Sequence, residues 1–216
     1  IFKNPNKTIL EFGAGTGRLA LPLIREGYLY SGVEISNEYV NYAHAQHNLK
    51  SIICDDMRAL DMQKNFDCLF IGFNTFAHLL DSTDVAQFFN AVKLHMHKKS
   101  HFYIDIFMPH PSFLYREHGQ KEKIMDFFDS TIQEDVIIEE TLDYNPATNI
   151  MSVTWNYIKS KNVIYHTFEF KMKVYYPDTM NRILIDAGFS IQSVKGDYRG
   201  SILTEDSELQ LYDCTL

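Results

Sequence analysis

Three glycines at alternate positions carry the clearest chemical signal in the chain. Residues 8–18 read TILEFGAGTGR, a short apolar run that contains Glu11, then the glycine-rich loop and Arg18. Glycine has no Cβ atom, so the backbone of such a loop can turn sharply and press against a ligand. A dinucleotide-binding loop has the spacing Gly-x-Gly-x-x-Gly, whereas here the third glycine comes one residue early. The spacing and the nearby acid favour a cationic ligand over a diphosphate.

Three further blocks follow the glycine loop, each at the end of an apolar run. Glu34 closes the run 28–33, Asp55-Asp56-Met57 follows the next run, and residues 66–76 read FDCLFIGFNTF. In order and spacing, the four blocks resemble class I S-adenosylmethionine-dependent methyltransferases. The glycine loop is similar to motif I of that family, and the resemblance covers roughly the first half of the chain.

The resemblance implies a role for each block in holding S-adenosylmethionine. The glycines would let the backbone approach the methionine part, with Glu11 near its ammonium group. Glu34 would accept hydrogen bonds from both ribose hydroxyls, a bidentate match for a carboxylate. Ile35 would pack on the adenine face, and Asp56 would accept from the adenine amino group, with Asp55 as the alternative register. The implied cofactor-binding set is Glu11, Gly13, Gly15, Gly17, Arg18, Glu34, Ile35, Asp55, Asp56, Met57, Phe73 and Asn74.

The methyl donor and acceptor should meet at the loop after the fourth strand. Nucleobase-amine methyltransferases carry Asp/Asn-Pro-Pro-Tyr/Phe there, but residues 74–77 read NTFA, which argues against a DNA adenine acceptor. Asn74 can orient a polar substrate atom or stabilise the loop. His78 can act as a base near neutral pH or simply begin a helix. Further candidates for acceptor contact, each with a structural role as its alternative, are Phe76, Asp105, His110, Tyr198 and Arg199.

A parallel sheet would bring these blocks together. Apolar runs and helical segments alternate up to residue 108, as in the crossover units of a parallel sheet. Helices are expected over 19–26, 83–97 and 177–187. The expected strands are 8–12, 29–33, 51–55, 67–72, 101–107, 191–194 and 209–216. The sequence thus predicts an α/β fold with a Rossmann-like, doubly wound sheet that is mostly parallel and has an antiparallel last strand.

Residues 109–176 break this alternation. Segments 150–158 and 168–174 alternate strictly between apolar and polar residues, and 134–142 does so more weakly. Such a period indicates an antiparallel sheet with one face in water. We therefore expect a core domain of residues 1–108 and 177–216 with an antiparallel β insertion of residues 109–176, which forms part of the acceptor pocket or a dimer contact. This plan resembles small-molecule methyltransferases that carry a β insertion after strand five, including some N-methyltransferases of amino sugars and of peptide or amino-acid amines.

The amino-acid composition bears on which partners the protein can bind. The chain has 28 acidic residues against 20 Lys and Arg, a net charge of −8, and no basic stripe of the kind that nucleic-acid binding requires. Its three cysteines follow no disulfide pattern, which favours a reducing, cytoplasmic location. No apolar stretch approaches the roughly 20 residues of a membrane span. The histidine pairs 44/47 and 95/97 lack a third ligand, so no metal is expected.

The sequence therefore predicts an S-adenosylmethionine-dependent methyltransferase for a small molecule, with an amine favoured over a hydroxyl acceptor, acting as a monomer or homodimer. Aligning the reactants can supply roughly 7–11 kcal/mol of such a displacement, so a clear cofactor cradle without a clear catalytic base is expected. A non-catalytic nucleotide-binding or interaction module stays open as an alternative. A nicotinamide-dependent oxidoreductase is disfavoured by the glycine spacing. Family members usually carry an N-terminal helical segment before the first strand, which either lies outside this sequence or is absent from this protein.

Overall fold

The computed structural model describes residues 6–216. The chain forms two compact units: the core unit takes in the chain up to Met108 together with Tyr176–Leu216, and the inserted unit is Pro109–Tyr175. Residues 1–5, where the expected core domain begins, lie outside the described residues. Among residues 6–216, no helix is long and apolar enough to cross a membrane.

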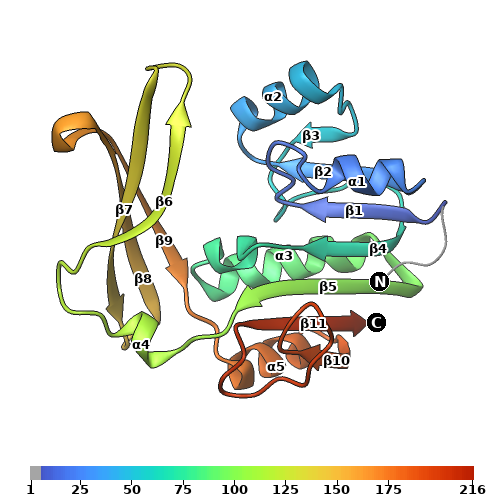
Figure 1. Cartoon of the computed structure of the whole chain (residues 1–216). Coiled ribbons are helices and arrows are strands. Elements are labelled where there is room, and N and C mark those ends of the chain that lie inside the picture. The colour runs from blue at the N-terminus through green and yellow to red at the C-terminus, as the bar shows by residue number, and fades with distance from the viewer. Residues whose placement is uncertain (1–5) are drawn as a thin grey trace. The chain divides into compact units, whose positions relative to one another are not determined.

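A seven-stranded sheet forms the centre of the core unit (Figure 1), with the order β10-β11-β5-β4-β1-β2-β3. β11 pairs antiparallel with both β5 and β10, and every other pair is parallel. The predicted Rossmann-like sheet with an antiparallel last strand is therefore confirmed. The strands are β1 (Thr8–Phe12), β2 (Leu29–Glu34), β3 (Ile52–Cys54), β4 (Phe66–Ile71), β5 (Met96–Phe107), β10 (Ser190–Lys195) and β11 (Leu209–Thr215).

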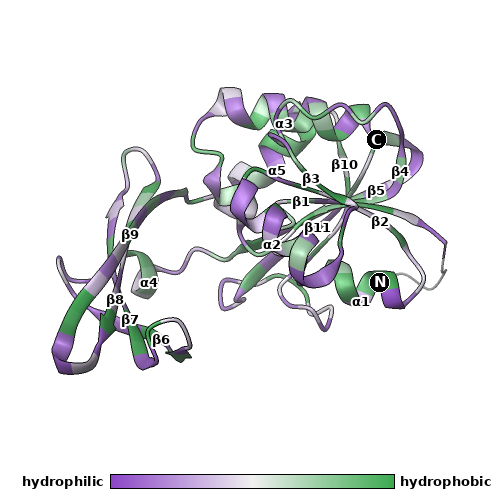
Figure 2. Cartoon of the chain, turned by 90° about the horizontal axis from the view of Figure 1, so that it is seen from above, coloured by the Kyte–Doolittle hydropathy of each residue, from purple (hydrophilic) through white to green (hydrophobic). Residues whose placement is uncertain are grey.

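Helices cover both faces of this sheet, and Figure 2 shows α1 and α3 on opposite sides of the strands. The alternation along β1 explains this arrangement: Ile9 packs with Ala20 and Val40 of the first two helices, whereas the Phe12 ring packs edge-on against Phe88 of α3. Each face of a central parallel strand is thus apolar, as expected for a sheet buried on both sides. The helices are α1 (Ala20–Arg25), α2 (Asn37–His47), the short 3-10 helix η1 (Thr75–His78), α3 (Ser82–Leu94) and α5 (Pro177–Asp186).

Helix α3 ends earlier than the sequence pattern predicts. The helix expected over 83–97 stops at Leu94, and β5 already begins at Met96. His95 causes the break, because its fully buried ring contacts the Ala91 carbonyl at 2.7 Å through Nδ1 and accepts from the Met62 N–H at 2.9 Å through Nε2. A buried polar ring that needs two partners thus fixes the helix end, and Met96 belongs to the strand.

The inserted unit is a four-stranded antiparallel sheet in the order β6-β7-β8-β9. β6 has no counterpart among the predicted strands, because most of its residues are exposed and it shows no period-two pattern. β9 begins five residues before the predicted 168–174 segment, at Val163. The elements of this unit are α4 (Pro111–Leu114), β6 (Glu122–Asp129), β7 (Glu134–Asn145), β8 (Ile150–Lys159), η2 (Ser160–Asn162) and β9 (Val163–Lys173).

Candidate functional site

The carboxyl ends of five parallel strands meet at one edge of the core sheet (Figure 1). β1 lies between β2 and β4, so the chain builds one side of the sheet through β2 and β3 and the other side through β4 and β5. Ligand crevices of open α/β sheets lie beyond the strand ends at such a switch point. We call this region, bordered by residues 13–19, 35–36, 55–58 and 72–76, the carboxyl edge.

The three glycines of the loop after β1 have different neighbours. All three have positive φ angles, which L side chains rarely adopt. A Cβ atom on Gly13 would overlap the Thr75 side chain, and one on Gly17 would overlap Leu49. A Cβ atom on Gly15 would meet nothing within 4 Å. Gly13 and Gly17 thus allow the loop to pack closely, whereas Gly15 borders open space that a ligand can occupy.

Glu34 ends β2 with its carboxylate held by two backbone groups. The Gly15 N–H donates to Oε2 and the Ser36 N–H donates to Oε1, both at 2.9 Å. Within residues 6–216 no lysine or arginine forms an ion pair with it. Each carboxylate oxygen offers about two acceptor positions, so both oxygens keep one for a ligand donor. The sequence-predicted pair of ribose-binding oxygens is therefore oriented beside the open Gly15 corner.

Glu11, in contrast, is buried beneath this loop, with 5% of its surface exposed. The Tyr30 hydroxyl donates to its carboxylate. Burial raises the pKa of Glu11 from 4.5 to about 7, against the opposing effects of the Tyr30 hydrogen bond and the Arg18 charge. Gly32 makes this pairing possible, because a Cβ atom there would lie 2.6 Å from the Tyr30 hydroxyl oxygen. The Tyr30–Gly32 support was missed by sequence reasoning, which treated β2 only as an apolar run.

The loop after β3 begins beside β2, since the Asp55 N–H donates to the Glu34 carbonyl at 3.1 Å. Ile35 is 68% exposed there and offers an apolar surface. Asp55 is exposed, while Asp56 and Met57 are half-buried. These residues, predicted to contact adenine, thus lie next to the ribose-binding candidate.

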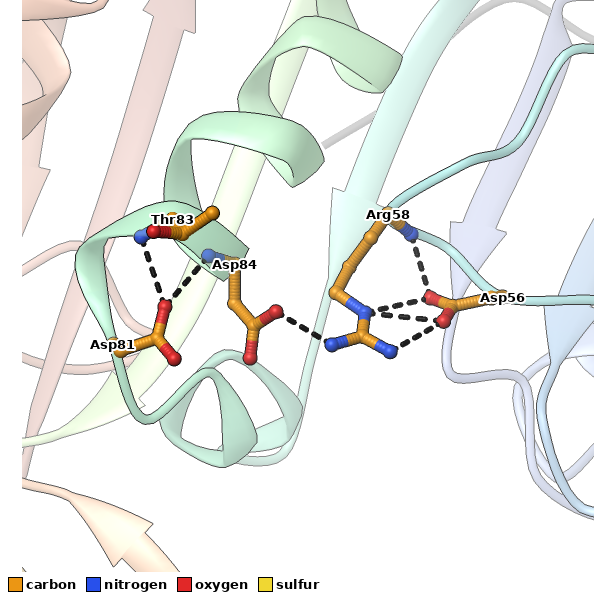
Figure 3. Close-up of polar contacts among 5 residues, drawn as sticks. All are labelled: Asp56, Arg58, Asp81, Thr83 and Asp84. Atoms are coloured by element: carbon orange, nitrogen blue, oxygen red, sulfur yellow. Dashed lines mark hydrogen bonds and ion pairs between the residues drawn. The ribbon is translucent and has the colours of Figure 1, made fainter.

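The carboxylate of Asp56 is not free, because Arg58 binds it (Figure 3). The Nη2 group of Arg58 lies 2.6 Å from Oδ2 and its Nε group 3.0 Å from Oδ1. These hydrogen bonds hold the pKa of Asp56 below its usual range. The Nη1 group reaches Asp84 of α3 at 2.5 Å. Sequence reasoning missed Arg58, although an arginine two residues after an acid in a turn is a visible signal.

On the other side of the edge, the loop after β4 is strained and tied to β5. Phe73 and Asn74 have positive φ angles of 52° and 63°, which are uncommon outside glycine. The Asn74 Oδ1 atom accepts from the Phe107 N–H at 2.7 Å. The Arg18 guanidinium lies over the Phe73 ring, 4.0 Å from its centroid. The Asn74 amide oxygen thus stabilises the loop, which is one of the two roles that the sequence suggested for this residue.

Asp105 and Tyr198 come together at the same edge. The Tyr198 hydroxyl donates to the Asp105 carboxylate, which also accepts from the Phe73 N–H at 3.3 Å. Both side chains border a cavity of about 340 Å³. Its other walls are mainly apolar and include Leu19, Pro22, Leu23, Phe70, Phe73 and Leu211. Two predicted acceptor-contacting residues thus share one cavity within the core unit.

Three other predicted acceptor-contacting residues of the core unit, Phe76, His78 and Arg199, do not line this cavity. Phe76 is a correction, because it is fully buried and its ring stacks on Phe89 with centroids 5.6 Å apart, so it is a core residue. His78 is exposed at the end of η1, and Arg199 is exposed beside Tyr198. His110 belongs to the inserted unit, where it begins α4.

Comparisons with known proteins agree on one family. Residues 9–99 match a family model described as a methyltransferase domain. A relative from Geobacillus sp. (strain WCH70) that carries a methyltransferase name is 32% identical over 90 residues, which make up 40% of this chain and 36% of that protein. The match thus spans only about a third of the relative's length.

Solved structures share the fold over nearly the whole chain. The CcbJ methyltransferase from Streptomyces caelestis has a TM-score of 0.84 at 18% identity, with 97% of this chain and 88% of that chain covered. An S-adenosylmethionine-dependent methyltransferase from Clostridium acetobutylicum ATCC 824 has a TM-score of 0.78 at 19% identity, covering 97% and 83%. The chain therefore has the fold of S-adenosylmethionine-dependent methyltransferases, and its residues 9–99 match a methyltransferase domain. The sugar N-methyltransferase KedS8 from Streptoalloteichus sp ATCC 53650 also shares this fold, with a TM-score of 0.74 at 15% identity, covering 97% and 81%.

Three features of the carboxyl edge suit a ligand that carries hydroxyl groups and a flat apolar ring. Glu34 presents two oriented acceptor oxygens, Gly15 borders open space, and Ile35 presents an apolar surface. The cavity beside Asp105 lies next to the loop after β4. The glycine loop and the separate small cavity thus both adjoin the strained loop after β4.

Proposed function

We propose that this methyltransferase transfers a methyl group from S-adenosylmethionine to an amine of a small molecule. The single observation that carries the proposal is the carboxylate of Glu34, oriented by two backbone N–H groups beside the open Gly15 corner. In this proposal Glu34 binds the ribose hydroxyls, Ile35 and Met57 flank the adenine ring, and Asp56 accepts from its amino group. Arg18, Phe73 and the backbone of the glycine loop border the methionine part.

The acceptor side rests on three observations. The cavity of about 340 Å³ is mainly apolar but has a carboxylate, Asp105, at its border. A single carboxylate in an apolar wall suits a cationic or neutral amine better than an anion. The net charge of −8 supports a small acceptor rather than a nucleic acid. KedS8, which shares the fold, is a sugar N-methyltransferase, and this favours nitrogen over oxygen as the acceptor atom.

The reaction is a displacement in which alignment matters most. Bound S-adenosylmethionine supplies a methyl group on a sulfonium, which is already an activated leaving group. In our proposal the loop of Phe73 and Asn74, tied to β5, separates donor and acceptor by a fixed distance. The acceptor nitrogen forms the new C–N bond with its lone pair while the S–C bond breaks, and the nitrogen then releases one proton to Asp105 or to water.

The Glu34→Ala variant tests the cofactor site. Calorimetry with S-adenosylhomocysteine should show roughly 100-fold weaker binding, because two hydrogen bonds to a charged group are lost at about 1.5–3 kcal/mol each before relaxation. The melting temperature should fall only modestly, because the substitution leaves the Gly15 and Ser36 N–H groups without their acceptor but breaks no side-chain pair. Glu26→Ala, which removes an exposed carboxylate after α1, serves as the control. Unchanged affinity in Glu34→Ala would remove the assignment.

A turnover assay separates an enzyme from a non-catalytic cofactor-binding module. The purified chain is incubated with S-adenosylmethionine and a panel of paired acceptors that differ only in an amine or a hydroxyl at one position. Formation of S-adenosylhomocysteine with the amine member of a pair is the expected result. Tight cofactor binding without turnover across the panel would instead favour the module, and turnover with hydroxyl members alone would correct the acceptor atom.

A further inference from the structure

Arg58 lies at the carboxyl edge and has no cofactor or acceptor role in the proposed function. It lies in the turn after β3, two residues beyond Asp56, and it makes every close side-chain contact that the Asp56 carboxylate has within residues 6–216. Figure 3 shows the guanidinium between the carboxylates of Asp56 and Asp84. A group in this position controls how Asp56 can meet a ligand.

The acceptor positions of Asp56 are nearly filled. Oδ1 accepts from the Arg58 backbone N–H at 2.9 Å and from Nε at 3.0 Å. Oδ2 accepts from Nη2 at 2.6 Å, with a longer contact of 3.1 Å to Nε. An ionised carboxylate offers about four acceptor positions and no donor. Three N–H groups occupy three of them, so about one position remains for a ligand.

The opposite edge of the guanidinium fixes the clamp to a helix. The Arg58 Nη1 group lies 2.5 Å from Oδ1 of Asp84, in the first turn of α3. That turn is itself capped, because Asp81 accepts from the N–H groups of Thr83 and Asp84, both at 2.9 Å (Figure 3). The planar fork of arginine thus bridges two carboxylates in one fixed geometry. Asp56 is held by Arg58 of its own turn, and Arg58 is held in turn by Asp84 of α3.

We propose that Arg58 is a positioning residue that makes Asp56 selective for a purine with an amino group at position 6. Arg58 keeps the carboxylate ionised and turned so that its one remaining acceptor position meets the amino group. A purine with a carbonyl at that position would place an acceptor against an acceptor and is rejected, because a polar group that loses its partner on binding costs more than a missing contact. This inference rests on the proposed function, in which Asp56 faces adenine.

The test compares two ligands that differ only at this position, S-adenosylhomocysteine and S-inosylhomocysteine, by calorimetry. Wild type should prefer the adenine ligand by at least about tenfold, the worth of one charged hydrogen bond. In Arg58→Gln the preference should fall below about threefold, and Arg58→Lys, which keeps the charge but loses the fork, should lie between them. Arg25→Gln removes an exposed charge from the end of α1 and should keep the wild-type preference.

The readout is the ratio of the two affinities, which a loss of general stability does not change. Equal weakening of both ligands in Arg58→Gln, with the ratio kept, would show a purely structural role and overturn the inference. A ratio that collapses in Asp55→Asn but survives in Asp56→Asn would also overturn it, because Asp55 would then read the base. If wild type binds neither ligand, it is the proposed function that fails, so the two failures are distinguishable.

Discussion

The two halves of the carboxyl edge are built in different ways. On the side of β1 to β3, contacts of short or moderate separation orient the groups: Glu34 is bonded to the N–H two residues later and to one 19 residues earlier, and Asp56 to the side chain two residues later. On the side of β4 and β5, distant contacts do this work: Asn74 is bonded to a residue 33 positions away, and Tyr198 to Asp105 at a separation of 93. The first half, proposed for the cofactor, thus depends mainly on turns and neighbouring strands, whereas the second depends on contacts between segments far apart in the chain.

This difference implies that the two halves should respond separately to substitution. A change in a short motif should affect cofactor binding without moving the β5 side. A change in a long-range contact should affect the acceptor cavity while the cofactor half stays intact. The predictions below use single substitutions to test this separation.

Gly15→Val should have the largest effect, because it fills the one open corner of the glycine loop. A Cβ atom at this position meets no protein atom within 4 Å, so the valine branches would occupy the ligand's space and calorimetry should detect no binding of S-adenosylhomocysteine. Gly15→Ala is the matched control: it has a similar backbone cost of about 1–2 kcal/mol for positive φ but adds only one carbon, so measurable binding should remain. Equal affinities for the valine and alanine variants would show that the ligand does not pass this corner.

Glu11→Gln should have the second largest effect, on stability rather than on affinity. The pKa of Glu11 is about 7 in the folded protein, against 4.5 for an unburied glutamate. Between these two pH values the folded chain therefore holds a proton that the unfolded chain releases. The contribution of Glu11 to the free energy of unfolding of the wild type therefore falls as the pH rises from 4.5 through 7. The shift corresponds to about 3 kcal/mol.

Urea unfolding at several pH values between 5 and 8 measures this effect. The free energy of unfolding of Glu11→Gln, relative to wild type, should rise by about 2.5 kcal/mol across this range, because glutamine keeps the shape without the charge. Glu205→Gln removes an exposed carboxylate from the loop before β11. Its free energy of unfolding should depend on pH in the same way as that of the wild type. Parallel curves for Glu11→Gln as well would mean that the buried carboxyl does not titrate in this window.

The contrast between the halves also explains what the sequence could predict. Strand β2 and Glu34 follow from an apolar run that ends in an acid, and the order of the strands follows from alternation. The buried position of Glu11 could not be read in the same way, because it depends on Tyr30 and Gly32 of the neighbouring strand meeting it across the sheet. Short sequence patterns predict local structure, whereas contacts between neighbouring strands can be predicted only when the register of the strands is known.

The same limit applies to Phe76 and Arg58. The aromatic side chain of Phe76 lies in a motif loop, and only the packing of α3 shows that it belongs to the core. The spacing of Asp56 and Arg58 is visible in the sequence, but the second carboxylate of the clamp, Asp84, lies 26 residues after Arg58. Pairing over such distances needs the helix and the turn in place before any side chain can be assigned a partner.

Tyr198→Phe should have the smallest effect. It tests the β4 and β5 side of the carboxyl edge directly. The substitution keeps the ring beside the cavity but removes the hydroxyl that donates to Asp105. One net hydrogen bond is worth about 0.5–1.5 kcal/mol, so the KM for the first amine found in the turnover panel should rise roughly threefold to tenfold. Affinity for S-adenosylhomocysteine should stay within about twofold, because Glu34 and the glycine loop are untouched. Tyr42→Phe, an exposed tyrosine of α2, should change neither value. An equal loss of cofactor affinity in Tyr198→Phe would mean that the two halves of the carboxyl edge act as one unit, and the separation drawn from their contacts would be wrong.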